Sequence, residues 1–213
     1  MPGDVPTGYS NAQIPVHAMD ILLQNIERTL NKSLPRELVP VLQQYVFQKS
    51  FEKKSLLAET GRVCRYLYFI EQGSCYSWYI NENGDKHAVQ FAIENYWITD
   101  STSFFSRKPG IFSIEALEPV QACMLNRENF ELLCDAHPLF DRFFRILNQN
   151  TLAGLHYRIA LSNSEQAPLR YREFSERYPQ FIQRIPQYLI ASYLGIKPQS
   201  LSRIRKQQSS RNL

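Results

Sequence analysis

The stretch from Tyr188 to Lys206 constrains the fold of this chain more than any other. Apolar residues recur at helical spacing before Gly195, which supplies the left-handed backbone conformation that ends a helix. Pro198 suits the first turn of a second helix, whose apolar face would contain Leu201 and Ile204. Two short helices joined by a tight turn are typical of a helix-turn-helix, whose second helix enters a DNA major groove.

The local charge favours DNA as the partner of this stretch. Residues 184–213 contain no Asp or Glu and six basic residues, which are Arg184, Lys197, Arg203, Arg205, Lys206 and Arg211. The whole chain has a formal charge of +4, so the excess is local and the part before residue 184 is slightly acidic. A cationic surface on a folded helix pair suits contact with phosphates. The alternative is a solvated helical hairpin with a frayed basic end.

The outer and leading side of the second helix holds the candidate DNA-binding residues. Gln199 can pair with adenine, and Arg203 can pair with O6 and N7 of guanine. Ser200 is expected to add contacts to bases or phosphates, and the neighbouring cations to hold the DNA backbone. The predicted DNA-binding residues are Lys197, Gln199, Ser200, Ser202, Arg203, Arg205 and Lys206.

Residues 45–125 contain short runs rich in β-branched and aromatic residues, separated by turn signals. Gly73 separates two runs, and Asn83-Gly84 favours a hairpin between two others because both residues tolerate left-handed conformations. The spacing of about eight to twelve residues predicts a small antiparallel barrel or jelly roll, an architecture that forms pockets. The expected strands are 46–51, 66–71, 74–80, 87–92, 111–116 and 122–125.

The segment from Glu94 to Gly110 interrupts these strands, and residues 100–105 can form one helical turn. It combines an acid, hydroxyls and two cations with aromatic residues. This composition fits either an effector-binding cassette on a barrel or a polar surface crossover, and by itself favours the crossover. The candidate effector-pocket residues are Thr99, Asp100, Ser101, Arg107 and Lys108.

Helical spacing covers most of the remaining chain, with expected helices at 19–30, after Pro35, at 128–136 and from 139 to 161. The last of these would be roughly 34 Å long at 1.5 Å per residue. Its seam is more apolar than a solvent-facing spacer needs, which favours pairing with a second copy of the chain, packing across its own barrel, or both on different faces. The seam residues are Phe140, Phe143, Phe144, Leu147, Thr151, Leu155 and Ile159.

The predicted fold class is α+β, with four parts along the chain. Residues 1–17 form a flexible leader, 18–138 a jelly-roll sensor domain, 139–161 a long dimerisation helix and 162–213 a helical DNA-binding domain. The polar segment from Ser162 to Pro168 is the expected hinge between domains.

Several classes of protein do not fit this sequence. No apolar run approaches the roughly 20 residues of a membrane span, and no signal peptide begins the chain, so a cytoplasmic protein is expected. The cysteines are widely separated and predict reduced core thiols without a metal or other cofactor. No nucleophile adjoins a base and no Gly-rich loop could bind phosphate, which argues against an enzyme. The cysteines are Cys64, Cys75, Cys123 and Cys134.

This order of parts resembles the Crp/Fnr transcription regulators over about residues 45–206. Two runs carry the resemblance, Cys64-Arg-Tyr-Leu-Tyr-Phe-Ile-Glu-Gln-Gly73 and Ile190-Ala-Ser-Tyr-Leu-Gly-Ile-Lys-Pro-Gln-Ser-Leu-Ser-Arg203. The resemblance implies a cyclic nucleotide-binding-like barrel, a homodimer formed through the long helix, and double-stranded DNA as partner. It also implies that Arg203 reads guanine, that Gln199 contacts a base, and that RNA polymerase and an unidentified small-molecule effector are further partners.

Two positions depart from the family pattern. Members that bind cyclic nucleotides carry a Gly-Glu pair and, about ten residues later, an Arg-Ser pair that holds the cyclic phosphate. The matching positions here are Thr99-Asp100 and Gly110-Ile111, so cyclic AMP is not expected to bind in the usual mode. Only seven residues follow Lys206, too few for the β-hairpin wing that usually follows the second helix, so either the wing is absent or the chain is truncated.

The sequence therefore predicts a dimeric, sequence-specific DNA-binding transcription regulator. Its barrel would set the distance or angle between two recognition helices through the long helix. The alternative is a ligand-binding or regulatory module that acts through protein partners, with the helical end as a docking surface. DNA affinity that falls steeply with salt would separate the two.

Overall fold

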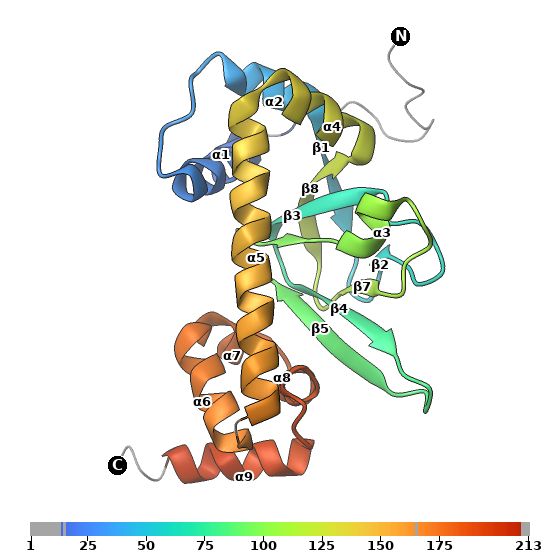
Figure 1. The fold of residues 1–213 in the computed structure, drawn as a ribbon, viewed down its shortest axis with the longest axis vertical. Helices are drawn as coiled ribbons and strands as arrows, with labels where there is room; N and C mark the ends of the chain where they lie inside the picture. The colour runs from blue at the N-terminus through green and yellow to red at the C-terminus, as the bar shows by residue number, and fades with distance from the viewer. Residues whose placement is uncertain (1–13, 15, 165, 210–213) are drawn as a thin grey trace.

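The computed structural model describes residues 14, 16–164 and 166–209 and has an α+β architecture. Two antiparallel sheets form a sandwich, and the long helix α5 (Pro138–Ser164) runs beside it from one end of the molecule to the other (Figure 1). The other described helices are α1 (Val16–Leu30), α2 (Leu38–Tyr45), α3 (Ser101–Ser106), α4 (Arg127–Ala136), α6 (Ala167–Arg177), α7 (Pro179–Arg184), α8 (Gln187–Leu194) and α9 (Pro198–Ser209). None of these described helices is long and apolar enough to cross a membrane.

Each sheet of the sandwich has four strands. The first has the order β1-β8-β3-β6 and the second the order β2-β7-β4-β5, with antiparallel pairing throughout. The predicted jelly roll is therefore confirmed. The strands are β1 (Val46–Phe51), β2 (Leu56–Ala58), β3 (Tyr66–Gln72), β4 (Cys75–Ile80), β5 (Lys86–Ala92), β6 (Trp97–Ile98), β7 (Ser113–Ala116) and β8 (Val120–Asn126).

The first sheet is buried on both faces, which explains why its strands lack a simple alternation of apolar and polar residues. Tyr68 and Ile70 of β3 belong to the core between the sheets, whereas Leu67 and Phe69 belong to a second core with α1 and α5. Because side chains alternate along a strand, one continuous apolar run covers both faces. Three buried phenylalanines of α5 contribute to the second core: Phe140, Phe143 and Phe144.

The sequence did not predict β2 and β6, which are three and two residues long. Runs this short contain too few residues to show an alternating pattern. The six predicted strands are present, and their ends differ from the prediction by at most two residues. The helical turn expected at 100–105 is α3, which is shifted by one residue.

Gly73 makes the turn between β3 and β4, as predicted. Its φ is +93°, a conformation that side chains other than glycine rarely adopt. A Cβ atom at this position would lie 2.2 Å from the carbonyl oxygen of Pro119, so the chain passes too close for any other residue. The close passage brings the start of β8 against the turn.

The connection after the long helix differs from the prediction. Helix α5 continues to Ser164, so Ser162 and Asn163 of the expected hinge are helical, and α6 begins at Ala167. With 27 residues, α5 is about 40 Å long at 1.5 Å per residue. Pro168 lies in the first turn of α6, where its missing N–H costs nothing. Helix α6 ends at Arg177, and Pro179 begins the short helix α7, which the sequence did not predict.

The predicted leader and the predicted absence of a wing concern the two ends of the chain. Helix α1 begins at Val16, so residues 16 and 17 of the predicted leader are helical. Ile14 of the leader is buried, and residues 1–13 and 15 lie outside the described residues. Residues 210–213 lie outside them as well, and the absence of a wing stays a prediction.

Candidate nucleic-acid interface and effector cassette

The C-terminal helix pair consists of α8 and α9. Helix α8 ends at Gly195, whose φ is +64°, and Pro198 is the first residue of α9. Leu201 and Ile204 of α9 are buried, as is Ile196 in the turn, and all three belong to one hydrophobic core. The predicted glycine turn and the buried face of the second helix are confirmed.

The other face of α9 is exposed at the end of the molecule opposite to α2 (Figure 1). Gln199, Arg203 and Lys206 are three or four residues apart, so they lie along one side of the helix. Among the predicted DNA-binding residues, Ser200 is half-buried. The others are exposed, namely Lys197, Gln199, Ser202, Arg203, Arg205 and Lys206.

Arg184 does not belong with these exposed cations, although the charge count grouped it with them. Its guanidinium forms ion pairs with Glu94 and Glu118 of the sandwich. Burial raises the pKa of the Glu94 carboxyl, but the hydrogen bonds from Arg184 and from backbone N–H groups more than offset this, and the net pKa lies below its ordinary value. The carboxylate is therefore ionised at neutral pH and keeps its pairing with Arg184.

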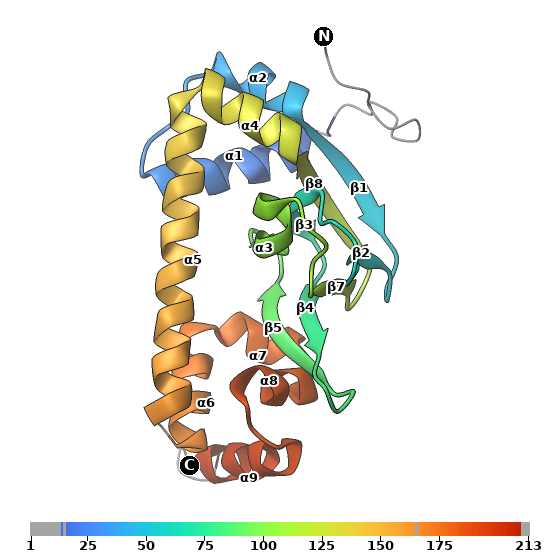
Figure 2. The same cartoon turned by 45° about the vertical axis from the view of Figure 1, so that its right-hand side comes forward.

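The C-terminal helices pack against the β4–β5 hairpin through a shared hydrophobic core, which we call the interdomain core (Figure 2). The ring of Phe91 lies 5.9 Å from the ring of Phe181 and 5.1 Å from that of Tyr193. The backbone N–H of Ala88 donates to the Ser192 hydroxyl at 3.0 Å. Other buried members are Tyr76, Trp78, Tyr171, Phe174, Ile185, Leu189, Ile190, Ala191 and Leu194.

Asp100 is a buried structural residue of the crossover between β6 and β7. Its carboxylate caps α3 by accepting from the backbone N–H of Ser103 at 3.0 Å, and it also accepts from the N–H of Phe112 at 3.3 Å. Only 1% of the residue is exposed. Asp100 therefore ties the start of α3 to the strand that follows, and its two oxygens are committed to backbone donors.

Gly110 lies directly beside this carboxylate. A Cβ atom built on Gly110 would be 2.2 Å from Oδ2 of Asp100 and 3.0 Å from Cβ of Ser103. Gly110 is the position at which the family pattern expects the phosphate-holding arginine. Any side chain at residue 110 would require Asp100 to move. The buried position of Asp100 is therefore compatible with glycine at residue 110 and not with the arginine of the family pattern.

Of the remaining cassette residues, two form bonds within the chain and two are exposed to solvent. The Thr99 hydroxyl donates to the carbonyl oxygen of Tyr66 at 2.9 Å. Arg107 forms an ion pair with Glu131 of α4 at 2.9 Å. Ser101 and Lys108 are exposed. The five residues are thus close in the chain but do not converge on one polar pocket, and their role toward an effector stays a prediction.

The four cysteines are free thiols. Burial raises the pKa of Cys75, and burial together with the neighbouring Glu71 raises that of Cys123. Burial likewise raises the pKa of Cys134 to about 12, so all three are protonated at neutral pH and are poor nucleophiles. Across the described part of the chain, no group of three or more His, Cys, Asp or Glu side chains could hold a metal ion.

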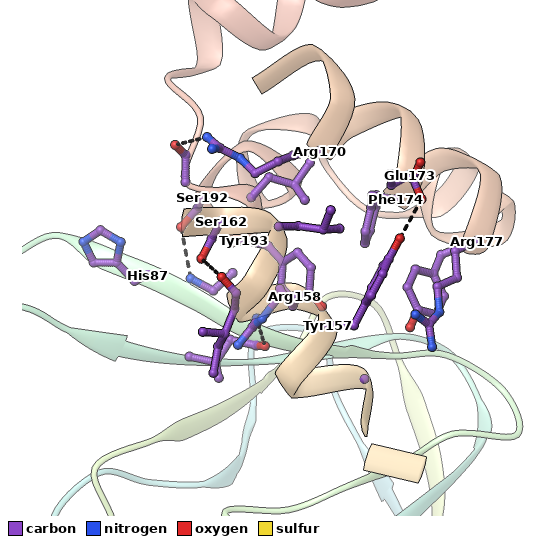
Figure 3. Close-up of a pocket in the computed structure, with 18 of the residues that line it drawn as sticks. His87, Tyr157, Arg158, Ser162, Arg170, Glu173, Phe174, Arg177, Ser192 and Tyr193 are labelled. Carbon is purple, nitrogen blue, oxygen red and sulfur yellow. Dashed lines mark hydrogen bonds between the residues drawn. The ribbon is translucent and has the colours of Figure 1, made fainter. Parts of the chain in front are cut away.

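A cavity of about 390 Å³ was missed by the sequence reasoning (Figure 3). It lies between the C-terminal half of α5, the β4–β5 hairpin, and helices α6 and α8. By contrast, the core between the two sheets contains tightly buried apolar side chains such as Ile70 and Ile114. Because the segments that line the cavity are far apart in the chain, no local motif could have indicated it.

Comparison with known proteins agrees with this architecture. Residues 48–137 match the family model of the cyclic nucleotide-binding domain. No curated protein sequence matches the chain. The solved structure of FixK2 from Bradyrhizobium japonicum is 15% identical, with a TM-score of 0.68 over 78% of this chain and 86% of that one.

Two further structures share the fold. The Catabolite Activator Protein of Thermus thermophilus is 16% identical, with a TM-score of 0.55 over 86% of this chain and 88% of that one. A CooA mutant from Carboxydothermus hydrogenoformans is 15% identical, with a TM-score of 0.64 over 88% and 84%. At this level of identity the likeness establishes a common fold.

The contact between residues 100 and 110 can be tested by a double-mutant cycle. Gly110→Ala should lower the free energy of unfolding by about 1–3 kcal/mol, because its methyl group overlaps the Asp100 carboxylate. Asp100→Ala should cost about 1 kcal/mol through loss of the cap. In the double variant the overlap with the carboxylate is gone, so its cost should be smaller than the sum of the two single costs. Urea denaturation measures all three, and strict additivity would contradict the contact.

Proposed function

Because this chain contains a cyclic nucleotide-binding domain and has the fold of Crp/Fnr-type regulators, we propose that it is a dimeric, sequence-specific DNA-binding transcription regulator. The observation that carries this proposal is the exposed cationic face of α9 at one end of the molecule. The helix is anchored by Leu201 and Ile204, so its outer side chains are presented on a rigid support. In this role the protein works in the cytoplasm, is not an enzyme, and has RNA polymerase as a protein partner.

In this proposal α8 and α9 form a helix-turn-helix, and α9 enters the major groove. Arg203 reads guanine, Gln199 contacts a neighbouring base, and Ser200 and Ser202 add base or phosphate contacts. Lys197, at the start of the helix, holds the DNA backbone. Arg205 and Lys206, like Lys197, contact the phosphates of the DNA backbone.

The dimer is proposed to form along the second half of α5. Leu152, Leu155 and Ile159 are 53%, 41% and 46% exposed and are three or four residues apart, so they form one apolar stripe. The first half of the predicted seam serves a different purpose, because Phe140, Phe143 and Phe144 are buried in the chain's own core. A stripe of this kind on a long helix suits pairing with the same stripe of a second copy.

The sandwich is proposed not to bind cyclic AMP in the usual mode. The support is the glycine at residue 110 and the buried Asp100 beside it, which leave a cyclic phosphate without a cation and next to an acid. Burying an anion against an unneutralised carboxylate is unfavourable.

The reading of a base by Arg203 can be tested on a duplex selected from a random pool. Arg203→Ala should cost about 1–3 kcal/mol and relax the preference at one position in each half-site. Lys197→Ala is the matched control, because loss of a phosphate contact should weaken all duplexes alike and lower the salt slope by about one. Fluorescence anisotropy over a salt series measures both.

Two outcomes of this experiment would contradict the proposal in different ways. Equal weakening of all duplexes by Arg203→Ala would make Arg203 a phosphate contact only. A native chain without salt-sensitive affinity for any duplex would remove DNA as the partner and favour a module that acts through proteins.

The dimer can be tested by placing a charge in the stripe. Leu155→Glu should convert the dimer to a monomer, because two carboxylates would be buried at the symmetric contact. Leu132→Glu is the control, since Leu132 is 56% exposed but lies on α4. Sedimentation equilibrium measures the mass, and an unchanged mass for Leu155→Glu would place the dimer contact elsewhere.

Calorimetric titration of the purified chain tests the cyclic nucleotide. Neither cyclic AMP nor cyclic GMP should bind with micromolar affinity, because residue 110 offers no cation to the phosphate. Micromolar binding of either compound would show that another group, such as Lys108, holds the phosphate.

A further inference from the structure

The cavity of about 390 Å³ described above, which we call the interdomain cavity, lies where three parts of the chain meet. One wall comes from α5 with Gly154, Tyr157 and Arg158, a second from the β4–β5 hairpin with His87, and a third from α6 and α8. Its volume of about 390 Å³ is within the range that holds small-molecule ligands in proteins. It is separate from the cassette between β6 and β7, because none of the five cassette residues lines it.

The cavity wall combines aromatic rings with positive charge. Three arginines line it, Arg158, Arg170 and Arg177, against one acid, Glu173. The Glu173 carboxylate accepts a hydrogen bond from the Tyr157 hydroxyl at 2.8 Å (Figure 3). Aromatic rings form much of the remaining wall: Tyr79, Phe112, Tyr157, Phe174, Tyr178 and Tyr193. Such a wall suits a ligand that is flat, apolar and negatively charged.

Two of the arginines are held in place by rings of the wall. The guanidinium of Arg158 lies 4.6 Å from the ring centroid of Tyr193 and donates to the carbonyl oxygen of Val89 at 2.7 Å. That of Arg177 lies 5.3 Å from the ring of Tyr157 and 5.5 Å from that of Tyr178. A guanidinium has five N–H donors in a rigid plane, so stacking leaves donors for a carboxylate and lowers the entropy lost on binding.

We propose that this cavity is the effector site of the protein and that it takes a small aromatic carboxylate. The ring of the ligand packs on the tyrosine and phenylalanine side chains, and its carboxylate accepts hydrogen bonds from Arg177. Glu173, whose carboxylate accepts a hydrogen bond from Tyr157, disfavours ligands that carry more than one negative charge. The proposal assigns the ligand class by the chemistry of the wall and does not involve a cyclic nucleotide.

The position of the cavity couples it to the C-terminal helices, a step that rests on the proposed DNA-binding function. The walls are already joined by the bond from Ala88 N–H to Ser192 and by the bond from Arg158 to Val89. A ligand that contacts all three walls stabilises this arrangement of α9 relative to the sandwich. By linkage, the ligand then changes the affinity for DNA by the same factor by which DNA changes the affinity for the ligand.

The binding test uses the full chain and three probes without DNA. Calorimetry should show one site per chain for 2-naphthoate. The neutral 2-naphthamide should have at least about tenfold lower affinity, because it cannot form an ion pair with a guanidinium. Decanoate, an aliphatic anion, should also bind more weakly, because it cannot stack on the rings.

Variants of the wall locate the site. Gly154→Leu should abolish 2-naphthoate binding by filling the cavity. It should also keep the chain folded, because a Cβ at residue 154 meets no atom within 4 Å and leucine favours the helix. Arg177→Met should weaken binding about tenfold by removing one cation. Arg172→Met is the matched control on the same helix, since Arg172 does not line the cavity, and its binding should equal that of the native chain.

Several results would overturn the proposal. These are the absence of 2-naphthoate binding, equal binding of the amide, tighter binding of decanoate, or unchanged binding in Gly154→Leu. The coupling is measured separately by titrating the selected duplex with and without saturating 2-naphthoate, where the Kd should change about fivefold or more. An unchanged Kd would overturn the regulatory part. Failure of any probe to bind leaves the DNA affinity of the native chain unaffected, so the two proposals fail independently.

Discussion

The interdomain core between the β4–β5 hairpin and the C-terminal helices is the interaction on which the arrangement of the molecule depends. Fully burying an aromatic side chain such as Phe91 or Phe181 stabilises by about 1.5–3 kcal/mol. By comparison, the ion pairs of Arg184 with Glu94 and Glu118 are about one third exposed, and pairs of this kind contribute about 0–1 kcal/mol. Apolar packing therefore holds the two parts together, and the ion pairs and the bond from Ala88 to Ser192 fix their orientation.

The long helix α5 connects this core to the rest of the fold, because its two halves contact different parts of the molecule. Its first half places Phe140, Phe143 and Phe144 in the core with α1 and the first sheet. Its second half leaves an apolar stripe exposed and lines the cavity with Gly154 and Arg158 on the adjoining side, and Ile159 belongs to both surfaces. A straight helix transmits a displacement along its axis with little loss, because its backbone hydrogen bonds resist bending. The stripe proposed as the dimer contact and the cavity thus lie on one helix, and α9 is connected to that cavity through α6 and α8.

The crossover between β6 and β7 shows how a polar segment can be used for folding. Asp100 has the side chain that a binding cassette would need, yet both of its oxygens accept from backbone N–H groups. A buried carboxylate without such donors would cost several kcal/mol, so satisfying it internally is the stable outcome. Gly110 completes the arrangement, because only a residue without a side chain leaves room for that carboxylate.

Local patterns in the sequence were sufficient for most elements of the fold and for α9. Gly195, Pro198, Leu201 and Ile204 act through backbone conformation and helical period, which depend on near neighbours. Only the tertiary structure decided the partners of Arg184, the close approach of Gly110 to the buried Asp100, and the cavity. These depend on residues such as Arg184 and Glu94 that are 90 positions apart, and contacts at such separations are set by how the sheets and helices pack, which local periodicity does not encode.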